Sequence, residues 1–168
     1  SEALDFRETA PAAVGRDFYL NENGEVDETR IRHRHQAAGV PGTVAGLALA
    51  HARHGRLPWR RLVDPAIGLA ERGIPVSPEL AQSLQEARER MAPWPASMKA
   101  FFKPDGAAYQ PGDTLAQPDL AASLKSIAEQ GAKAFYEGDI ARRLVADMQA
   151  HQGPITSDDL KNYRAVVR

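Results

Sequence analysis

The stretch V-P-G-T-V-A-G-L-A-L-A-H-A-R-H-G at residues 40–55 sets the fold class of this chain. Its proline and glycine open the segment, and the apolar residues that follow recur at the spacing of one helical face. Gly55 is expected to end the helix near His54. Gly42 and Gly46 would let another backbone approach closely, because glycine carries no Cβ. The stretch therefore predicts a helix that packs tightly against a neighbour.

The same signals recur downstream and predict a mainly α chain. Serine, threonine or aspartate before an apolar stripe indicates a helix start, proline suits the first turn, and glycine indicates an end. Helices are expected from Pro58 to Gly73, Ser77 to Pro93, Gln117 to Gly131 and Asp139 to Gly153, with a helical turn over 132–136 and a capped short helix from Thr156 to about Tyr163.

Pro65 interrupts the pattern of the Pro58–Gly73 helix. Proline lacks the N–H that continues the hydrogen-bond ladder, so the helix is expected to kink or to split there. An apolar stripe keeps the helical period through this segment, at Leu62, Val63, Ala66, Leu69 and Ala70.

Short strands are expected at both ends of the chain. Ala3–Phe6 resembles the end of a strand, and Ala165–Val167 the beginning of one. Residues 21–35, with a turn at Asn23-Gly24, are expected to form a polar surface loop or hairpin, and residues 94–111 to be irregular. The abrupt opening indicates a segment cut from a larger protein.

Composition excludes several classes of function. The 21 basic and 22 acidic residues nearly balance, which removes the electrostatic argument for binding nucleic acid or an anionic membrane. The absence of cysteine excludes disulfides, thiolate catalysis and thiolate zinc sites. The sequence contains no apolar run near the roughly 20 residues that span a bilayer, and its opening has no leader-like pattern.

Generic catalytic motifs are missing, so a self-contained active site is not expected. The sequence has no G-x-S-x-G, Walker, G-x-G-x-x-G or H-E-x-x-H pattern. His33 with His35, and His51 with His54, have spacings that a metal could use. The first pair lies in a basic run and the second at a helix end that favours cations, so neither a metal nor a cofactor is expected.

Other candidates also have structural explanations. Ser1 could act as an N-terminal nucleophile with its own amine as base, but a boundary of the chain is the favoured interpretation. Asp158-Asp159 and Glu86 with Glu89 could serve as acid–base pairs, but helix capping and solvated faces account for them better.

Arg7 is the remaining candidate, just past the expected first strand. From the residues alone, either a surface ion pair or a ligand-binding role fits an arginine in that position.

Six stretches, in order and over nearly the whole chain, carry a family resemblance. They are D-F-R-E-T-A-P at Asp5–Pro11, V-P-G-T-V-A-G at Val40–Gly46, H-G-R-L-P-W at His54–Trp59, P-A-I-G-L-A-E-R-G at Pro65–Gly73, F-Y-E-G at Phe135–Gly138 and I-T-S-D-D-L-K-N-Y at Ile155–Tyr163. Together they are similar to the large subunit of bacterial γ-glutamyltransferases. No single piece is decisive, but six in order are specific.

The resemblance implies the helical portion of an αββα N-terminal-nucleophile hydrolase fold, with residues 1–168 as one segment of the large subunit. Members of this family cut themselves into two subunits, and the threonine exposed at the start of the small subunit attacks the γ-carbonyl of glutathione or a related compound. The acyl group then passes to water, an amino acid or a peptide. None of the five threonines of this chain matches that nucleophile: Thr9, Thr29, Thr43, Thr114 and Thr156.

By the same resemblance, Arg7 is expected to bind the α-carboxylate of the γ-glutamyl group, and Glu8 either holds Arg7 or is a plain surface residue. The expected partners are the small catalytic subunit, a γ-glutamyl donor and an acceptor, without nucleic acid or membrane, in a periplasmic or secreted enzyme. Two alternatives stay open: an acylase or amidase of the same fold, and a non-catalytic helical interaction module.

Overall fold

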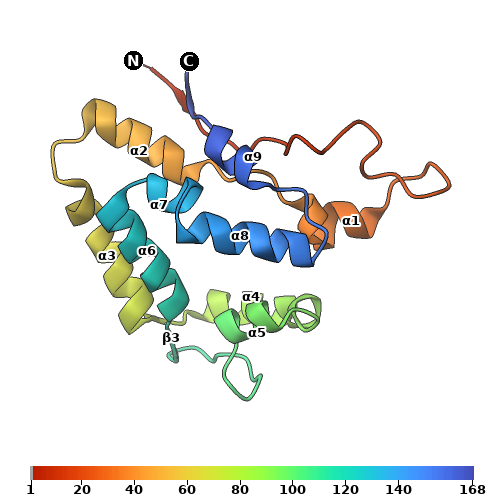
Figure 1. The fold of residues 1–168 in the computed structure, drawn as a ribbon. Coiled ribbons are helices and arrows are strands. Elements are labelled where there is room, and N and C mark those ends of the chain that lie inside the picture. The colour runs from red at the N-terminus through yellow and green to blue at the C-terminus, as the bar shows by residue number, and fades with distance from the viewer. Residues whose placement is uncertain (1) are drawn as a thin grey trace. The chain divides into compact units, whose positions relative to one another are not determined.

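Helices make up most of the regular structure in the computed structural model, which describes residues 2–168 (Figure 1). The predicted mainly α class is confirmed, while Ser1, weighed as a nucleophile, lies outside the described residues. The helices are α1 Glu28–His33, α2 Thr43–His54, α3 Trp59–Arg72, α4 Pro78–Met91, α5 Pro95–Phe101, α6 Pro118–Gln130, α7 Lys133–Tyr136, α8 Asp139–Ala150 and α9 Ser157–Asn162, with a 3-10 helix, η1, at His35–Ala37. The strands are β1 Leu4–Asp5, β2 Ile74–Pro75, β3 Thr114–Leu115 and β4 Val166–Val167. No helix among residues 2–168 has both the length and the apolar character to cross a membrane.

The two ends of the chain pair with each other. Strands β1 and β4 are antiparallel, with Leu4 opposite Val167 and Asp5 opposite Val166. Figure 1 shows the two terminal segments side by side. The strands expected at both ends are therefore confirmed, and their mutual pairing is new, because no local pattern names a partner 160 or so residues away.

The chain separates into two compact units. One contains the residues up to Trp59 together with Ser126–Arg168, and the other contains Arg60–Lys125. The single segment expected over residues 1–168 stays a prediction. The first unit has a core drawn from α7, α8, α9 and the residues around them, consisting of Val40, Tyr136, Ala141, Val145, Met148, Ile155, Leu160 and Tyr163.

The second unit has a smaller core and a short antiparallel pair, β2 with β3. Gly73 ends α3 with a φ of +82°, a conformation that glycine adopts without strain. Ser77 begins α4 as expected, since its hydroxyl accepts a hydrogen bond from the Leu80 N–H at 3.2 Å. The core residues of this unit are Val76, Ala81 and Leu115.

The loop or hairpin expected over residues 21–35 is confirmed in its first part, where Leu20 and Val26 form an antiparallel bridge around the turn at Asn23-Gly24. Helices occupy its second part and the start of the 94–111 stretch, and there the predictions are wrong. Helix α1 occupies part of the polar 21–35 stretch, because the Asp27 carboxylate caps it by accepting from the N–H groups of Thr29 and Arg30 at 3.0 Å each. Helix α5 begins at Pro95, in the stretch expected to be irregular. Helix α1 starts at a capping aspartate and α5 starts with a proline, but both have little apolar periodicity, which is why the periodicity search missed them.

Helix α3 also differs from expectation. It continues unbroken through Pro65, so the split is wrong, and the kink that was the other expected outcome stays a prediction. Proline removes one hydrogen bond from the ladder, and the turns on either side keep theirs. Leu62 and Leu69 are 48% and 55% exposed, whereas Ala70 is buried as expected and Ile67 is buried beside it, so the inward stripe matches the expected one only in part.

The other helix ends follow the expected chemistry with one exception. Thr156 and Asp159 form a capping box in which each side chain bonds the other residue's backbone N–H. Gly131 follows α6 with a φ of +67°. The exception is α8, where Gly138 is the N-cap and Asp139 is the first helical residue, since the carboxylate turns to Arg142 and Arg143 instead.

Helix α2 packs against the chain that follows β1, as Gly42 and Gly46 suggested. A Cβ at Gly46 would lie 2.1 Å from Phe6 Cγ, and one at Gly42 would lie 2.1 Å from the Phe6 carbonyl oxygen. Both distances are far inside van der Waals contact. The two glycines therefore fix how closely α2 approaches Phe6.

Replacing Gly46→Ala is expected to lower the free energy of unfolding. The added methyl would meet the root of the Phe6 side chain, which cannot swing away without moving the backbone. Overpacking costs about 1–3 kcal/mol, against a gain of roughly 1 kcal/mol for alanine over glycine within a helix. Urea unfolding measures the difference, and Gly15→Ala is the matched control because no atom lies within 4 Å of its added Cβ. A Gly46 variant as stable as the control would contradict this packing.

The Asp159 carboxylate joins α9 to the amino-terminal segment, and its contribution should depend on pH. It accepts from Ala12 N at 2.8 Å and from Thr156 N at 2.9 Å. Partial burial opposes ionisation, but these hydrogen bonds lower the pKa of Asp159 below its ordinary 3.8. Because the folded pKa is the lower one, the stabilisation is complete above the unfolded pKa and is lost as pH falls through the folded pKa.

Asp159→Asn is therefore expected to lower the free energy of unfolding by about 1 kcal/mol at neutral pH, in the range for lost helix caps. The gap between variant and wild type should close as pH falls below 4, roughly the ordinary aspartate pKa. Urea unfolding from pH 3 to pH 7 measures the gap. A gap that stays constant across this range would show that the charge of Asp159 contributes nothing.

Candidate functional site

The backbone around Arg7 is fixed from several sides. Arg7 follows β1, which pairs with β4. Across this pair, Arg168 Nη2 lies 2.6 Å from Asp5 Oδ2, and the Asp5 Oδ1 atom accepts from Arg7 N at 3.3 Å. The hydrogen bond from the Arg168 side chain, followed by that from the Arg7 backbone, holds the pKa of Asp5 below its usual value. Asp5 therefore stays ionised at neutral pH and anchors the turn that leads into Arg7.

Tyr163 holds the same segment from the opposite end of the chain. Its hydroxyl donates to the Arg7 carbonyl oxygen at 2.8 Å. Burial, and then the negative charges of Asp5 and Glu8, raise the pKa of Tyr163, so the hydroxyl keeps its proton at neutral pH. Tyr163 is the C-cap of α9 and thereby ties Arg7 to this helix, whose start the capping box orders.

A second tyrosine extends this contact to α2. The rings of Tyr136 and Tyr163 stack with centroids 5.8 Å apart and planes 7° apart. The Tyr136 hydroxyl donates to the Pro41 carbonyl at 2.7 Å and accepts from Ala45 N at 3.2 Å. Burial raises the pKa of Tyr136, which keeps this hydroxyl a donor too. The two hydroxyls thus fix the chain on both sides of the Gly42 contact.

The Arg7 side chain, in contrast, is open to solvent. It is 84% exposed, and its Nη2 atom lies 3.3 Å from Glu8 Oε1. The Glu8 backbone N–H, and then the Arg7 guanidinium, hold the pKa of Glu8 below its usual value. A guanidinium has five N–H donors, so one bond to Glu8 leaves capacity for a planar anion. Arg7 lines a shallow depression of about 300 Å³ together with Leu4, Asp5, Phe6, Glu8 and Thr43.

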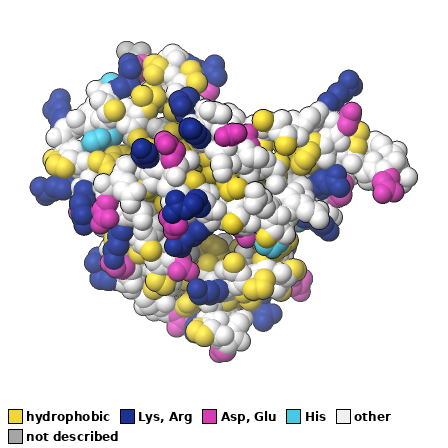
Figure 2. Space-filling view, viewed as in Figure 1, with side chains coloured by type: hydrophobic (Ala, Val, Ile, Leu, Met, Phe, Trp, Pro, Cys, Tyr) yellow, Lys and Arg dark blue, Asp and Glu magenta, His cyan; other side chains and the backbone are white. Residues whose placement is uncertain are grey.

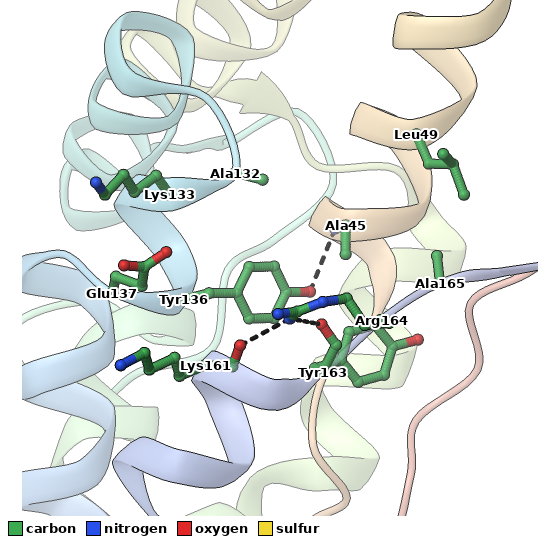
Figure 3. A pocket seen from close by; sticks show the side chains of 10 residues that line it. All are labelled: Ala45, Leu49, Ala132, Lys133, Tyr136, Glu137, Lys161, Tyr163, Arg164 and Ala165. Atoms are coloured by element: carbon green, nitrogen blue, oxygen red, sulfur yellow. Dashed lines mark hydrogen bonds between the residues drawn. The ribbon is translucent and has the colours of Figure 1, made fainter.

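A second hollow, of about 390 Å³, lies beside the tyrosine pair (Figure 3). Arg164 Nη1 donates to the carbonyls of Lys161 and Tyr163 at 2.7 Å each, as the dashed lines in Figure 3 mark. This cation satisfies carbonyls at the end of α9, where positive charge is favoured. The hollow is lined by Ala45, Leu49, Ala132, Lys133, Tyr136, Glu137, Lys161, Tyr163, Arg164 and Ala165.

The histidine pairs considered from spacing do not converge. His51 Nε2 bonds the Leu57 carbonyl oxygen at 2.8 Å, while His54 Nε2 bonds Glu2 Oε1 at 2.6 Å. His35 Nε2 instead lies 2.9 Å from Asp147 Oδ2, a partner 112 positions away in the sequence. Basic and acidic side chains are interspersed on the visible face (Figure 2), in keeping with the balanced charge.

The carboxylate pairs divide between capping and surface contacts. Asp159 belongs to the capping box of α9, as favoured from the sequence. Glu86 accepts from Gln82 Nε2 at 2.9 Å along one exposed helical face. Sequence analysis missed Tyr163 and Asp5 as residues that position Arg7. Tyr163 is 156 positions from Arg7, so no local pattern indicated that contact, whereas the bond from Arg7 N to the Asp5 carboxylate spans only two positions.

Solved structures of N-terminal-nucleophile hydrolases contain the same arrangement of elements. The crystal structure of Helicobacter pylori gamma-glutamyltranspeptidase matches with a TM-score of 0.97 at 42% identity, covering 99% of this chain and 48% of that one. Gamma-glutamyltranspeptidase from Pseudomonas nitroreducens, complexed with L-DON, matches with a TM-score of 0.91 at 42% identity, covering 99% and 48%. The fold is therefore that of a mostly helical segment of this hydrolase class.

Sequence comparison narrows the class further. The glutathione hydrolase proenzyme of Escherichia coli strain K12 is 42% identical over 166 residues, which are 99% of this chain and 29% of that protein. The family described as Gamma-glutamyltranspeptidase matches residues 1–168. The chain belongs to the gamma-glutamyltranspeptidase family, as the six stretches indicated. It spans under a third of the length of the curated relatives it matches.

Proposed function

We propose that the intact protein transfers or hydrolyses the γ-glutamyl group of glutathione and related compounds. In this proposal, an N-terminal threonine in a second subunit of the same proenzyme forms the acyl-enzyme, which passes to water, an amino acid or a peptide. The names of the relatives, glutathione hydrolase proenzyme and gamma-glutamyltranspeptidase, support this substrate class and the processing. The observation that carries the proposal is an exposed guanidinium, Arg7, on a backbone fixed from several sides.

Arg7 would bind the α-carboxylate of the γ-glutamyl group. A planar guanidinium can hold a carboxylate through two parallel hydrogen bonds, which fixes both charge and orientation. Because the Arg7 carbonyl bonds Tyr163 and its N–H bonds Asp5, the side chain starts from a fixed Cα. Glu8 would keep the guanidinium in the depression between substrates. Restricting the free site in this way reduces the entropy lost when the substrate binds.

This chain would contribute substrate binding and rely on its partner subunit for the nucleophile. We propose that the chain alone is inactive, since none of its threonines matches the nucleophile of the family. We also propose that the intact enzyme works in the periplasm or outside the cell.

Arg7→Lys in the intact protein is expected to raise KM for a γ-glutamyl donor by at least about tenfold while self-cleavage persists. A lysine offers one charged point in place of two parallel donors, and a charge-assisted hydrogen bond contributes about 1.5–3 kcal/mol. Steady-state kinetics gives KM, and gel electrophoresis follows the cleavage. Arg56→Lys is the matched control, because Arg56 is also exposed in the same unit. Unchanged KM in the Arg7 variant would remove Arg7 from the site.

The donor class is tested with γ-glutamyl-p-nitroanilide. Intact, self-cleaved protein should release p-nitroaniline, and the isolated 168-residue chain should release none. A cleaved protein without product would favour the acylase alternative, which has support in the cephalosporin acylase from Bacillus halodurans, matched with a TM-score of 0.81 at 27% identity. Turnover by the isolated chain would place the nucleophile within it. The same assay on separated cell fractions tests the location.

A further inference from the structure

Three potential metal ligands meet at the carboxyl end of α8, apart from the Arg7 depression. His35 Nε2 lies 2.9 Å from Asp147 Oδ2, and His151 Nδ1 lies 3.3 Å from Asp147 Oδ1. One ligand atom from each of the three side chains lies within 4.8 Å of the others. His35 and Asp147 are 112 residues apart in the sequence, so spacing alone could not reveal this group.

The two segments that carry these side chains are held together by other contacts. Gln36, next to His35, is buried, and its Nε2 donates to the Gln152 carbonyl at 2.9 Å. The Tyr19 hydroxyl donates to the Gln36 carbonyl at 3.0 Å. Gly153 packs so closely that an added Cβ would lie 3.0 Å from His35 Cβ and 2.3 Å from Met148 Sδ. The backbone therefore sets the approach of His35 to α8 without help from an ion.

The ligand side chains differ in exposure in a way that suits a bound cation. His35 is 19% exposed, while Asp147 and His151 are 60% and 44% exposed. Asp147 and His151 are four residues apart near the end of one helix, so they lie on one face. The imidazole rings of His35 and His151 stack with centroids 4.3 Å apart. The open side would leave room for water to complete the coordination.

We propose that His35, Asp147 and His151 bind a divalent transition-metal ion of the zinc type. Two neutral imidazoles and one carboxylate are ligands that zinc uses, with metal–nitrogen and metal–oxygen bonds of about 2.0–2.2 Å. Such bonds place ligand atoms about 3.3 Å apart around a tetrahedral ion. His35 Nε2 and His151 Nδ1 lie 2.9 and 3.3 Å from different oxygens of the Asp147 carboxylate, so binding one ion requires the side chains to rotate, and the exposed His151 ring must leave its stack with the His35 ring. Asp147 Oδ2 would exchange its hydrogen bond to His35 Nε2 for a bond to the ion, and His151 Nδ1 would exchange its bond to the Asp147 backbone carbonyl, at 2.9 Å, for one to the ion.

Zn²⁺ titration of the intact protein by calorimetry tests the proposal, with Co²⁺ as a spectroscopic probe. Wild type is expected to bind one ion at this site and to show visible Co²⁺ bands of low coordination number. His151→Ala and Asp147→Asn should each weaken Zn²⁺ binding by more than about tenfold, as the loss of a ligand predicts. Zn²⁺ should raise the Tm of wild type and not of these variants, because an ion that binds the folded state stabilises it.

His33→Ala is the matched control, because His33 lies in the same basic segment and outside the group. It should keep wild-type affinity and the Tm increase. His35→Gln, which preserves most of the side-chain volume, tests the less exposed ligand, and its Tm without metal reports whether the fold survives. Equal Zn²⁺ binding by wild type and the Asp147 and His151 variants would overturn the proposal, as would no binding by wild type.

Discussion

The hydrogen bond from the Tyr163 hydroxyl to the Arg7 carbonyl is the contact on which the site depends. It joins residues 156 positions apart, and it is buried enough that water competes poorly for either group. The same hydroxyl occupies the space that a Cβ at Gly42 would need, since that Cβ would lie 2.0 Å from it. One tyrosine thus requires a glycine at the N-cap of α2, an ordered end to α9 and a fixed turn after β1.

The surrounding electrostatics place one exposed cation among acidic neighbours. Asp5 is neutralised by Arg168 across the β1–β4 pair, which leaves Glu8 as the carboxylate that competes for the Arg7 guanidinium. The Arg7–Glu8 pair is exposed, and such pairs contribute little to stability. Breaking the Arg7–Glu8 pair when another anion binds Arg7 therefore costs little free energy. The backbone of Arg7, in contrast, stays fixed by its hydrogen bonds.

Sequence patterns predicted most of the helices because their signals are local. The Thr156–Asp159 capping box and the Gly55 end of α2 need only neighbouring residues, and both were predicted correctly. Helices α1 and α5 were missed because each is short and is defined by its start, at Asp27 and Pro95, with little apolar periodicity. Pro65 caused the opposite error, because it suggested a split in a helix that the turns on either side keep continuous. In the candidate site, resemblance supplied Arg7, but contacts such as Tyr163 to Arg7 and His35 to Asp147 are long-range and have no local pattern.

The pairing of β1 with β4 places the first and last strands of this 168-residue chain side by side. Ala3 and Arg168 exchange two backbone hydrogen bonds of 3.1 and 2.8 Å, so only a few residues would be needed to bridge them. If the chain were cut in an exposed loop, such as the one around Gly24, the β1–β4 pair and its contacts would remain in place. The β1–β4 pair therefore holds its two segments together independently of any single loop between them.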